Sequence, residues 1–251
     1  MSSPASTFPG GTSVTLLDVY DDAAPDGLLG GSPHLHLAST ECYVVVAGAG
    51  ELHTLDPSGA RATPLGPGSV VWFTPGTVHR AVNLGGLQVL VIMGNAGLPE
   101  AGDAVMTFPV DVVADPDRYR AAAALPVDDG SGASVAVRAA AARRRRDLAV
   151  EGYLPIRDAL LRGDDGPLRA FQAAAAAIVA DRAPGWAEIV AAGPLAQAEQ
   201  SLAIVEGLAR GIHPHLAAAR VSQAPEPAGE RGFGMCGRLR AFDVSGGAVA
   251  D

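Results

Sequence analysis

Short apolar runs separated by turn residues dominate the first 95 residues of the chain. Apolar and polar positions alternate over Glu51–Leu55 and, less regularly, over Ser13–Tyr20. Compact apolar runs cover Cys42–Val46, Val70–Phe73 and Leu87–Met93. Alternation with a period of two and short runs rich in β-branched residues are typical of strands. Strands at this regular spacing predict a double-sheet barrel or jelly roll.

The pattern changes after about residue 110, where alanine, leucine, glutamate and arginine, all good helix formers, become dominant. Asp115 followed by Pro116 is typical of a helix start. Further helical stretches are predicted at Ser134–Glu151, Leu154–Arg162, Pro167–Arg182 and Pro194–Ala209. Large aliphatic side chains are sparse here. We therefore interpret the region as a helical extension that caps the barrel or forms a dimer interface.

The chain is thus predicted to have three parts. Residues 1–110 form the barrel, residues 111–225 form the helical extension, and residues 226–251 form a tail. Within the tail, Phe233–Phe242 has the composition of a late strand. We expect this strand to return to an edge of the barrel.

Four residues of the predicted barrel could hold one metal ion. His34 and His36 are two positions apart, so in a strand their imidazoles lie on the same face. Glu41 opens the next apolar run, and His79 follows a Pro–Gly turn. Three imidazoles and a carboxylate suit a divalent transition metal such as Fe, Mn, Ni, Co, Cu or Zn. The sequence leaves the identity of the metal open.

The spacing of these residues resembles the two motifs of the cupin family. The first motif is matched by His34, His36, Glu41 and Gly48, and the second by Gly68, Pro75, Gly76, His79 and Asn83. Two positions depart from the pattern: Leu28 replaces a glycine, and Pro75 directly precedes Gly76. The resemblance covers residues 28 to 95 and implies a cupin double-stranded β-helix with a C-terminal helical extension, the four metal ligands and a homodimer.

Several other side chains are candidates for the pocket. Tyr43 shares the face of Glu41 if the strand is regular, which makes it a candidate acid, base or hydrogen-bond donor. The alternative is a core or rim tyrosine. Trp72, Phe73, Gln88 and Met93 could line a substrate pocket, although their facing is not fixed by the sequence. This mostly apolar set favours a small organic substrate.

Charge and composition exclude several classes of protein. The net charge of −9 argues against a nucleic-acid partner, and we interpret Arg143–Arg146 as a solvated helix surface. Arg80, next to His79, is expected to point outward. All 18 basic residues are arginine, which excludes a Schiff-base or P-loop lysine. No apolar stretch reaches the roughly 20 residues of a membrane helix. Met1–Ala5 lacks the features of a signal peptide, so we expect a cytoplasmic protein.

These observations predict a metal-dependent enzyme that acts on a small molecule. A mononuclear non-haem oxygenase is the leading hypothesis, because a site of three histidines and one glutamate resembles that of cupin dioxygenases. A non-redox isomerase, epimerase or lyase is the first alternative. A small-molecule binding or sensory protein without turnover is the second, since the fold supports many functions.

Overall fold

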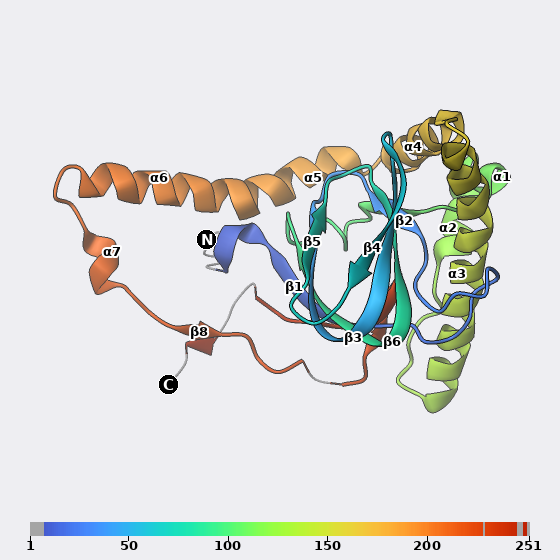
Figure 1. The fold of residues 1–251 in the computed structure, drawn as a ribbon. Helices are drawn as coiled ribbons and strands as arrows, with labels where there is room; N and C mark the ends of the chain where they lie inside the picture. The colour runs from blue at the N-terminus through green and yellow to red at the C-terminus, as the bar shows by residue number, and fades with distance from the viewer. Residues whose placement is uncertain (1–7, 228, 245–247, 250–251) are drawn as a thin grey trace.

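The computed structural model describes residues 8–227, 229–244 and 248–249 (Figure 1). The residues on which the signal-peptide prediction rests, Met1–Ala5, lie outside this range. Across the described part of the chain, no helix combines the length and the apolar character needed to cross a bilayer.

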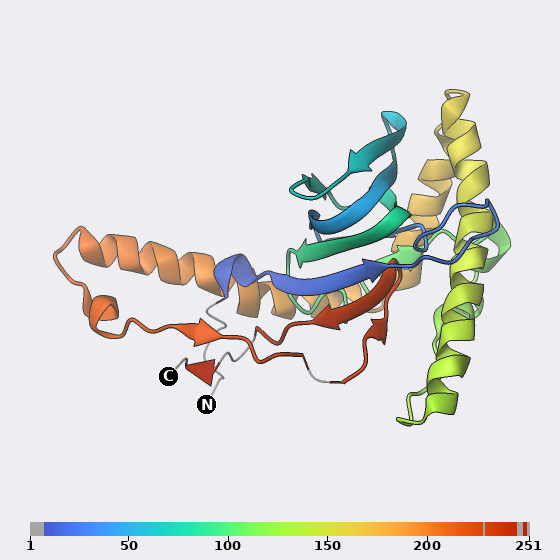
Figure 2. The same cartoon turned by 60° about the horizontal axis from the view of Figure 1, so that its bottom comes forward.

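A single curled antiparallel sheet forms the barrel (Figure 2). Its main path runs β4-β3-β6-β1-β10-β9, while β2, β5 and β7 pair alongside it. The strands are β1 Ser13–Val19, β2 His34–His36, β3 Glu41–Asp56, β4 Gly59–Leu65, β5 Val70–Phe73, β6 Val78–Met93, β7 Ala104–Met106, β9 Gly232–Phe233 and β10 Gly237–Ala241. This architecture agrees with the predicted double-stranded β-helix.

The glycines near residue 48 bend a strand at the point where the sequence predicted its end. β3 pairs with β6 along most of its length, and its register shifts between Val45 and Gly50. Gly48 has a φ of 74°, and a Cβ there would lie 2.1 Å from the Gly86 carbonyl oxygen. Only glycine fits this close approach without strain. The two apolar runs expected as separate strands are therefore one long bulged strand.

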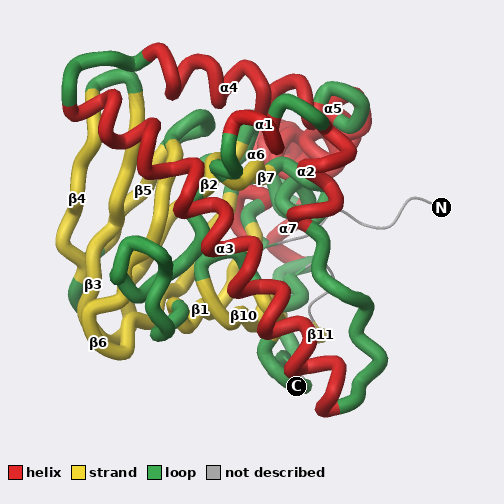
Figure 3. Tube along the Cα trace, turned by 90° about the vertical axis from the view of Figure 1, so that its right-hand side faces the viewer, coloured by secondary structure: helices red, strands yellow, loops and turns green. Residues whose placement is uncertain are grey.

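Helices pack on one side of the barrel and then extend away from it (Figures 1 and 3). They are α1 Val110–Val113, α2 Pro116–Ala123, α3 Gly132–Leu161, α4 Gly166–Val179, α5 Ala183–Val190, α6 Ala196–Leu208 and α7 Pro214–Ala217. A 3-10 turn at Pro9–Gly11, a π-helical turn at Ala191–Leu195 and a small sheet of β8 Ser222–Gln223 with β11 Ala248–Val249 complete the described elements.

Helix α3 continues through residues 152–153, where the sequence predicted a break between two helices, and it also contains Pro155. Tyr153 and Ile156 flank the proline, and both are buried in the same apolar cluster against the barrel. Packing on both sides of Pro155 thus outweighs the hydrogen bond that proline removes.

Two apolar clusters hold the molecule together. One fills the barrel and includes Leu17 and Val89. The other joins the outside of the barrel to the helices and includes Leu35, Tyr153 and Phe171. The helical region therefore shares its core with the barrel. The segment Phe233–Phe242, predicted as one strand, forms the hairpin of β9 and β10 instead. β10 pairs antiparallel with β1, so the C-terminal segment also lies against the barrel.

Two arginines that were expected to face outward or solvent are buried. Arg80 is fully buried, and its Nη1 lies 2.5 Å from Asp26 Oδ2. Arg146 is also buried and pairs with Asp22 at 3.0 Å and with Asp147 at 2.8 Å. A paired carboxylate lowers the free-energy penalty of burying a guanidinium. Because α3 lies flat against the barrel, two members of the arginine run face inward.

Candidate metal centre

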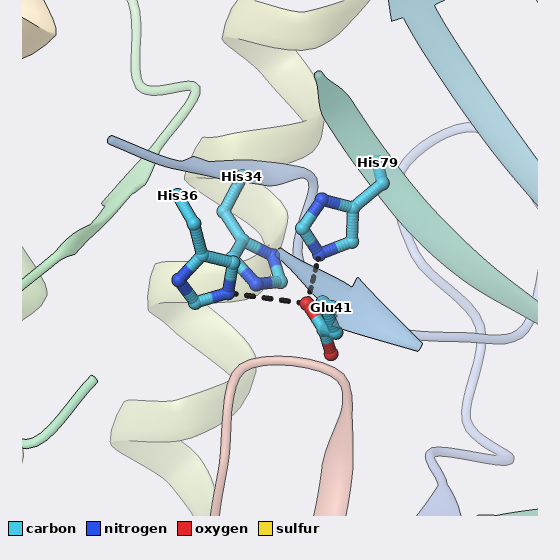
Figure 4. A group of neighbouring side chains, drawn as sticks. All are labelled: His34, His36, Glu41 and His79. Carbon is cyan, nitrogen blue, oxygen red and sulfur yellow. Dashed lines mark ion pairs between the residues drawn. The ribbon is translucent and has the colours of Figure 1, made fainter. Parts of the chain in front are cut away.

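Strand pairing brings the four candidate ligands together (Figure 4). β2 pairs with β6 so that His34 lies opposite His79. Glu41, the first residue of β3, pairs with Met93 at the other end of β6. All four side chains are buried, and one potential ligand atom from each lies within 4.8 Å of the others. The cluster thus unites residues from three strands.

The chemistry of this cluster fits a metal ion. Glu41 Oε2 lies 3.2 Å from His36 Nε2 and 3.1 Å from His79 Nε2. Among the described residues, Glu41 Oε2 and His79 Nε2 are buried without a hydrogen-bond partner. Buried polar atoms are almost always satisfied, so such a group requires an explanation. A divalent cation bound by His34, His36, Glu41 and His79 would satisfy these atoms.

The other ring nitrogens are held by oxygen acceptors. His34 Nδ1 lies 2.9 Å from the Ser32 carbonyl oxygen, and His79 Nδ1 lies 3.2 Å from that of Thr77. We assign the proton of both rings to Nδ1, which leaves Nε2 free to bind a metal. Outer contacts of this kind orient histidine ligands in metal sites.

The outer contact of His36 is a carboxylate that the sequence analysis missed. Asp103 Oδ2 lies 3.3 Å from His36 Nδ1. The same carboxylate accepts hydrogen bonds from the backbone N–H groups of Leu37 at 2.9 Å, Ala38 at 2.7 Å and Ser39 at 3.1 Å. Asp103 therefore anchors the link that leads to Glu41 and places a negative charge beside the His36 ring. It lies far along the chain from either, and no spacing signal points to it.

The buried charges strongly shift the pKa values of the cluster. Burial lowers the pKa of His36, but Asp103 and Glu41 outweigh it and raise this pKa to about 9. Burial lowers the pKa of His34 well below 6.5, and the neighbouring His79 and His36 lower it further. Burial raises the pKa of Glu41, but His79 and His36 hold it below its usual 4.5. A cation and a proton on His36 would therefore compete for the same nitrogen.

A cavity of about 320 Å³ lies beside His34, His36 and Glu41. Its walls come from β1, β6, helix α3 and the hairpin of β9 and β10, which passes close to the cluster in Figure 4. Most of the wall is apolar; the lining includes Leu17, Val91, Met93, Arg145, Met235 and Leu239. The volume suits a small organic molecule.

The predicted pocket residues divide between the two faces of the sheet. Met93 lines the cavity. Phe73 is buried against the His79 ring, with a centroid distance of 4.2 Å. Trp72 does not line the cavity and is 68% exposed, because successive strand residues point to opposite faces. Gln88 is also outside the cavity, and its Nε2 donates to Asp18 Oδ1 at 2.8 Å.

Tyr43 lies inside the barrel core. It is fully buried, it is not part of the cavity wall, and its hydroxyl contacts Cys236 Sγ at 3.7 Å. Burial raises the pKa of Tyr43 well above 10, and Cys236 and Glu41 raise it further. The hydroxyl is therefore held in its protonated form inside the core, near Glu41.

Sequence reasoning missed two further parts of the cavity wall. Arg145 comes from the arginine run on α3, and residues 233–236 come from the C-terminal hairpin. Both lie more than 50 residues beyond His79. Long-range packing alone places them here.

Comparison with family models gives a match to the Cupin domain over residues 23–93. This segment contains all four candidate ligands. Residues 23–93 are therefore a cupin domain, and the chain combines this domain with a C-terminal helical region. The predicted family and fold class are confirmed.

Solved structures with similarity to the chain include three bacterial proteins. Pac13 from Streptomyces, a nucleoside dehydratase, is 17% identical over 41% of this chain and 69% of that chain, with a TM-score of 0.29. A Klebsiella pneumoniae protein with a double-stranded beta-helix domain is 18% identical over 38% and 67%, with a TM-score of 0.28. The capsular polysaccharide assembling protein CapF from Staphylococcus aureus is 22% identical over 33% and 23%, with a TM-score of 0.24.

The match to Streptomyces PAC13 with uridine spans 62% of that protein, which is less than two thirds of its length. No curated protein matches the chain. Similarity at this level says nothing about the substrate of this protein.

Proposed function

We propose that this protein is a metal-dependent enzyme that acts on a small organic molecule. The observation that carries the proposal is the cluster of three histidines and one glutamate, whose ligand atoms lie within 4.8 Å of one another beside an open cavity. Structural metal sites are closed, whereas catalytic sites keep access for a substrate. The four ligands are His34, His36, Glu41 and His79.

The leading reaction class is that of a mononuclear non-haem oxygenase. When bound, a divalent ion supplies a Lewis acid, and Fe, Mn, Cu or Ni adds redox chemistry. The protein contributes the orientation of the site and an apolar cavity wall. Asp103 lies against the His36 ring, and Leu17, Val91 and Met93 supply apolar surface for the reacting molecule.

The experiment has two stages. Protein purified without a metal-affinity tag is first analysed for its metal content. The Fe(II)-loaded protein is then screened with small organic molecules, both neutral and charged, while dissolved oxygen is recorded. Substrate-dependent oxygen consumption supports the oxygenase. Equal turnover without oxygen, with Zn or Mn in the site, supports an isomerase, epimerase or lyase instead. Thermal stabilisation by a ligand without turnover supports a binding protein.

We further propose a homodimer, as the cupin resemblance implies. Leu202 and Val205 on α6 are 63% and 62% exposed, on a helix that extends away from the barrel (Figure 1). A second copy of the chain would cover such apolar side chains. Light scattering at micromolar concentration tests this proposal: a mass near 25.3 kDa, that of one chain, would refute it.

A further inference from the structure

Three arginine side chains are buried in the described part of the chain, and one of them differs from the others. Arg80 and Arg146 each form an ion pair with an aspartate. Arg145 is only 9% exposed, yet no described carboxylate forms an ion pair with it. A buried charge without a counter-charge carries a large free-energy penalty. The feature to explain is therefore a buried guanidinium that has no counter-charge.

Neutral groups hold Arg145 in place. Its Nη1 donates to the Ala123 carbonyl oxygen at 3.3 Å, and its Nη2 donates to those of Phe233 at 3.3 Å and Gly234 at 2.9 Å. Its Nε has no hydrogen-bond partner among the described residues. These contacts fix the position of the guanidinium and leave its charge uncompensated.

The surrounding titratable groups do not compensate the charge either. Burial raises the pKa of both Tyr20 and Tyr119 to about 12, so these neighbouring phenols are neutral at physiological pH. Burial lowers the pKa of Arg145, and the positive charge of Arg138 acts in the same direction. The environment therefore favours an added anion.

Arg145 lines the same cavity as His34, His36 and Glu41. In Figure 4, helix α3 passes behind the cluster and the β9–β10 hairpin lies below it. The other carboxylate of the wall outside the cluster, Glu100, is exposed and forms no ion pair with Arg145. An anion that enters this cavity would thus meet both a guanidinium and the candidate metal centre.

We propose that Arg145 binds a carboxylate group of the substrate, so that the substrate is a small organic acid with an apolar body. Arginine pairs strongly with carboxylates through charge-assisted hydrogen bonds. Leu17, Val91 and Met93 provide the apolar surface for the remainder of the molecule. This inference rests on the proposed function, because it assigns the substrate class of the same site.

Benzoate and benzamide are suitable probes, since they share size and shape but differ in charge. Their affinities for the Zn(II)-loaded protein are measured by calorimetry. The wild type is expected to prefer benzoate, and Arg145→Gln is expected to reduce this preference by roughly tenfold or more. Arg144→Gln is the matched control: it removes the same charge from an exposed neighbour on the same helix and should leave the preference unchanged.

The ratio of the two affinities separates recognition from a structural role. If Arg145 merely held the hairpin, its loss would weaken both probes equally. Should Arg145→Gln fail to fold, the ¹⁵N resonance of Arg145 Nε in the wild type gives a second measurement. It is expected to shift with benzoate and to stay in place with benzamide. An unchanged ratio in folded, metal-loaded Arg145→Gln, or no shift with benzoate, would overturn the inference.

Metal content is determined for every sample before the titration. A wild type that binds no Zn(II) contradicts the proposed function. A wild type that holds Zn(II) but shows no preference for benzoate contradicts only the role of Arg145.

Discussion

Asp103 Oδ2 lies 3.3 Å from Nδ1 of His36, while Glu41 Oε2 lies 3.2 Å from Nε2 of the same ring. The imidazole is thus held between two carboxylates, one inside the candidate metal cluster and one behind it. The outer carboxylate also anchors the link between β2 and β3 through three backbone N–H groups. Asp103 therefore links the backbone conformation between β2 and β3 to the orientation of His36, a candidate metal ligand.

Replacing Asp103 with asparagine is expected to weaken metal binding about 10- to 100-fold, because the negative charge beside the His36 ring is lost and an NH2 group replaces one of the two acceptor oxygens. Competition with a chromophoric chelator measures the affinity. Glu100→Gln serves as the control, because it removes a carboxylate from the cavity wall that is not part of the cluster of candidate metal ligands. Equal affinities of Asp103→Asn and the wild type would refute the orienting role.

Asp26→Asn is expected to destabilise the protein by about 3 kcal/mol at pH 7, because it leaves the buried guanidinium of Arg80 without its counter-charge. Urea unfolding gives the free energy. Asp56→Asn, which breaks the more exposed pair with Arg61, is the control and should have an effect below about 1 kcal/mol. Equal effects of the two variants would show that the burial of Arg80 is unimportant.

The pH dependence of this ion pair has a definite sign. Burial raises the pKa of Asp26, but the hydrogen bond and the charge of Arg80 outweigh it and lower this pKa below 3.8. A lowered folded-state pKa gives stability that is present above the unfolded value and is lost as the pH falls. The stability difference between the wild type and Asp26→Asn should stay constant from roughly pH 5 to pH 8. It should shrink below about pH 4, where an aspartate of the unfolded chain becomes protonated. A difference that grows on acidification would contradict this assignment.

Gly48→Ala is expected to destabilise the barrel by about 2 kcal/mol or more, since the new Cβ would meet the Gly86 carbonyl oxygen at 2.1 Å. Gly27→Ala separates the cost of backbone strain at a positive φ from the cost of a steric clash. Gly27 also has a positive φ, 80°, but nothing lies within 4 Å of its Cβ position. Its substitution should cost about 1 kcal/mol. Thermal unfolding of both variants measures the difference, and equal losses would show that the bulge tolerates a side chain.

Phe73→Ala is expected to destabilise the fold by about 3 kcal/mol, because the ring is buried between Tyr43 and His79. Trp72→Ala removes a larger but 68% exposed side chain and should change stability far less. Chemical denaturation compares the two variants. A larger loss for Trp72→Ala would reverse the assignment of the two strand faces.

Local spacing was sufficient to find the four candidate ligands. His34 and His36 share a strand face by parity alone, and the offsets of Glu41 and His79 match known motifs. Spacing could not reveal Asp103 or Arg145. Both reach the site through tertiary packing, which no local pattern encodes.

The direction and burial of individual side chains were harder to predict than the presence of strands and helices. Apolar residues fill both faces of Val70–Phe73, so the sequence did not reveal that Trp72 points outward and Phe73 inward. The arginine run looked solvated because four consecutive residues cover every side of a helix. The structure buries Arg145 and Arg146 because the helix presses one side against the barrel.

Metal content of the tag-free protein tests the central claim most directly. It is measured by elemental analysis for the wild type and for four variants: His34→Ala, His36→Ala, Glu41→Ala and His79→Ala. Circular dichroism confirms that each variant is folded. We predict close to one divalent transition-metal ion per wild-type chain and a loss of that ion in every variant. Full occupancy in all four folded variants would contradict the proposed metal centre.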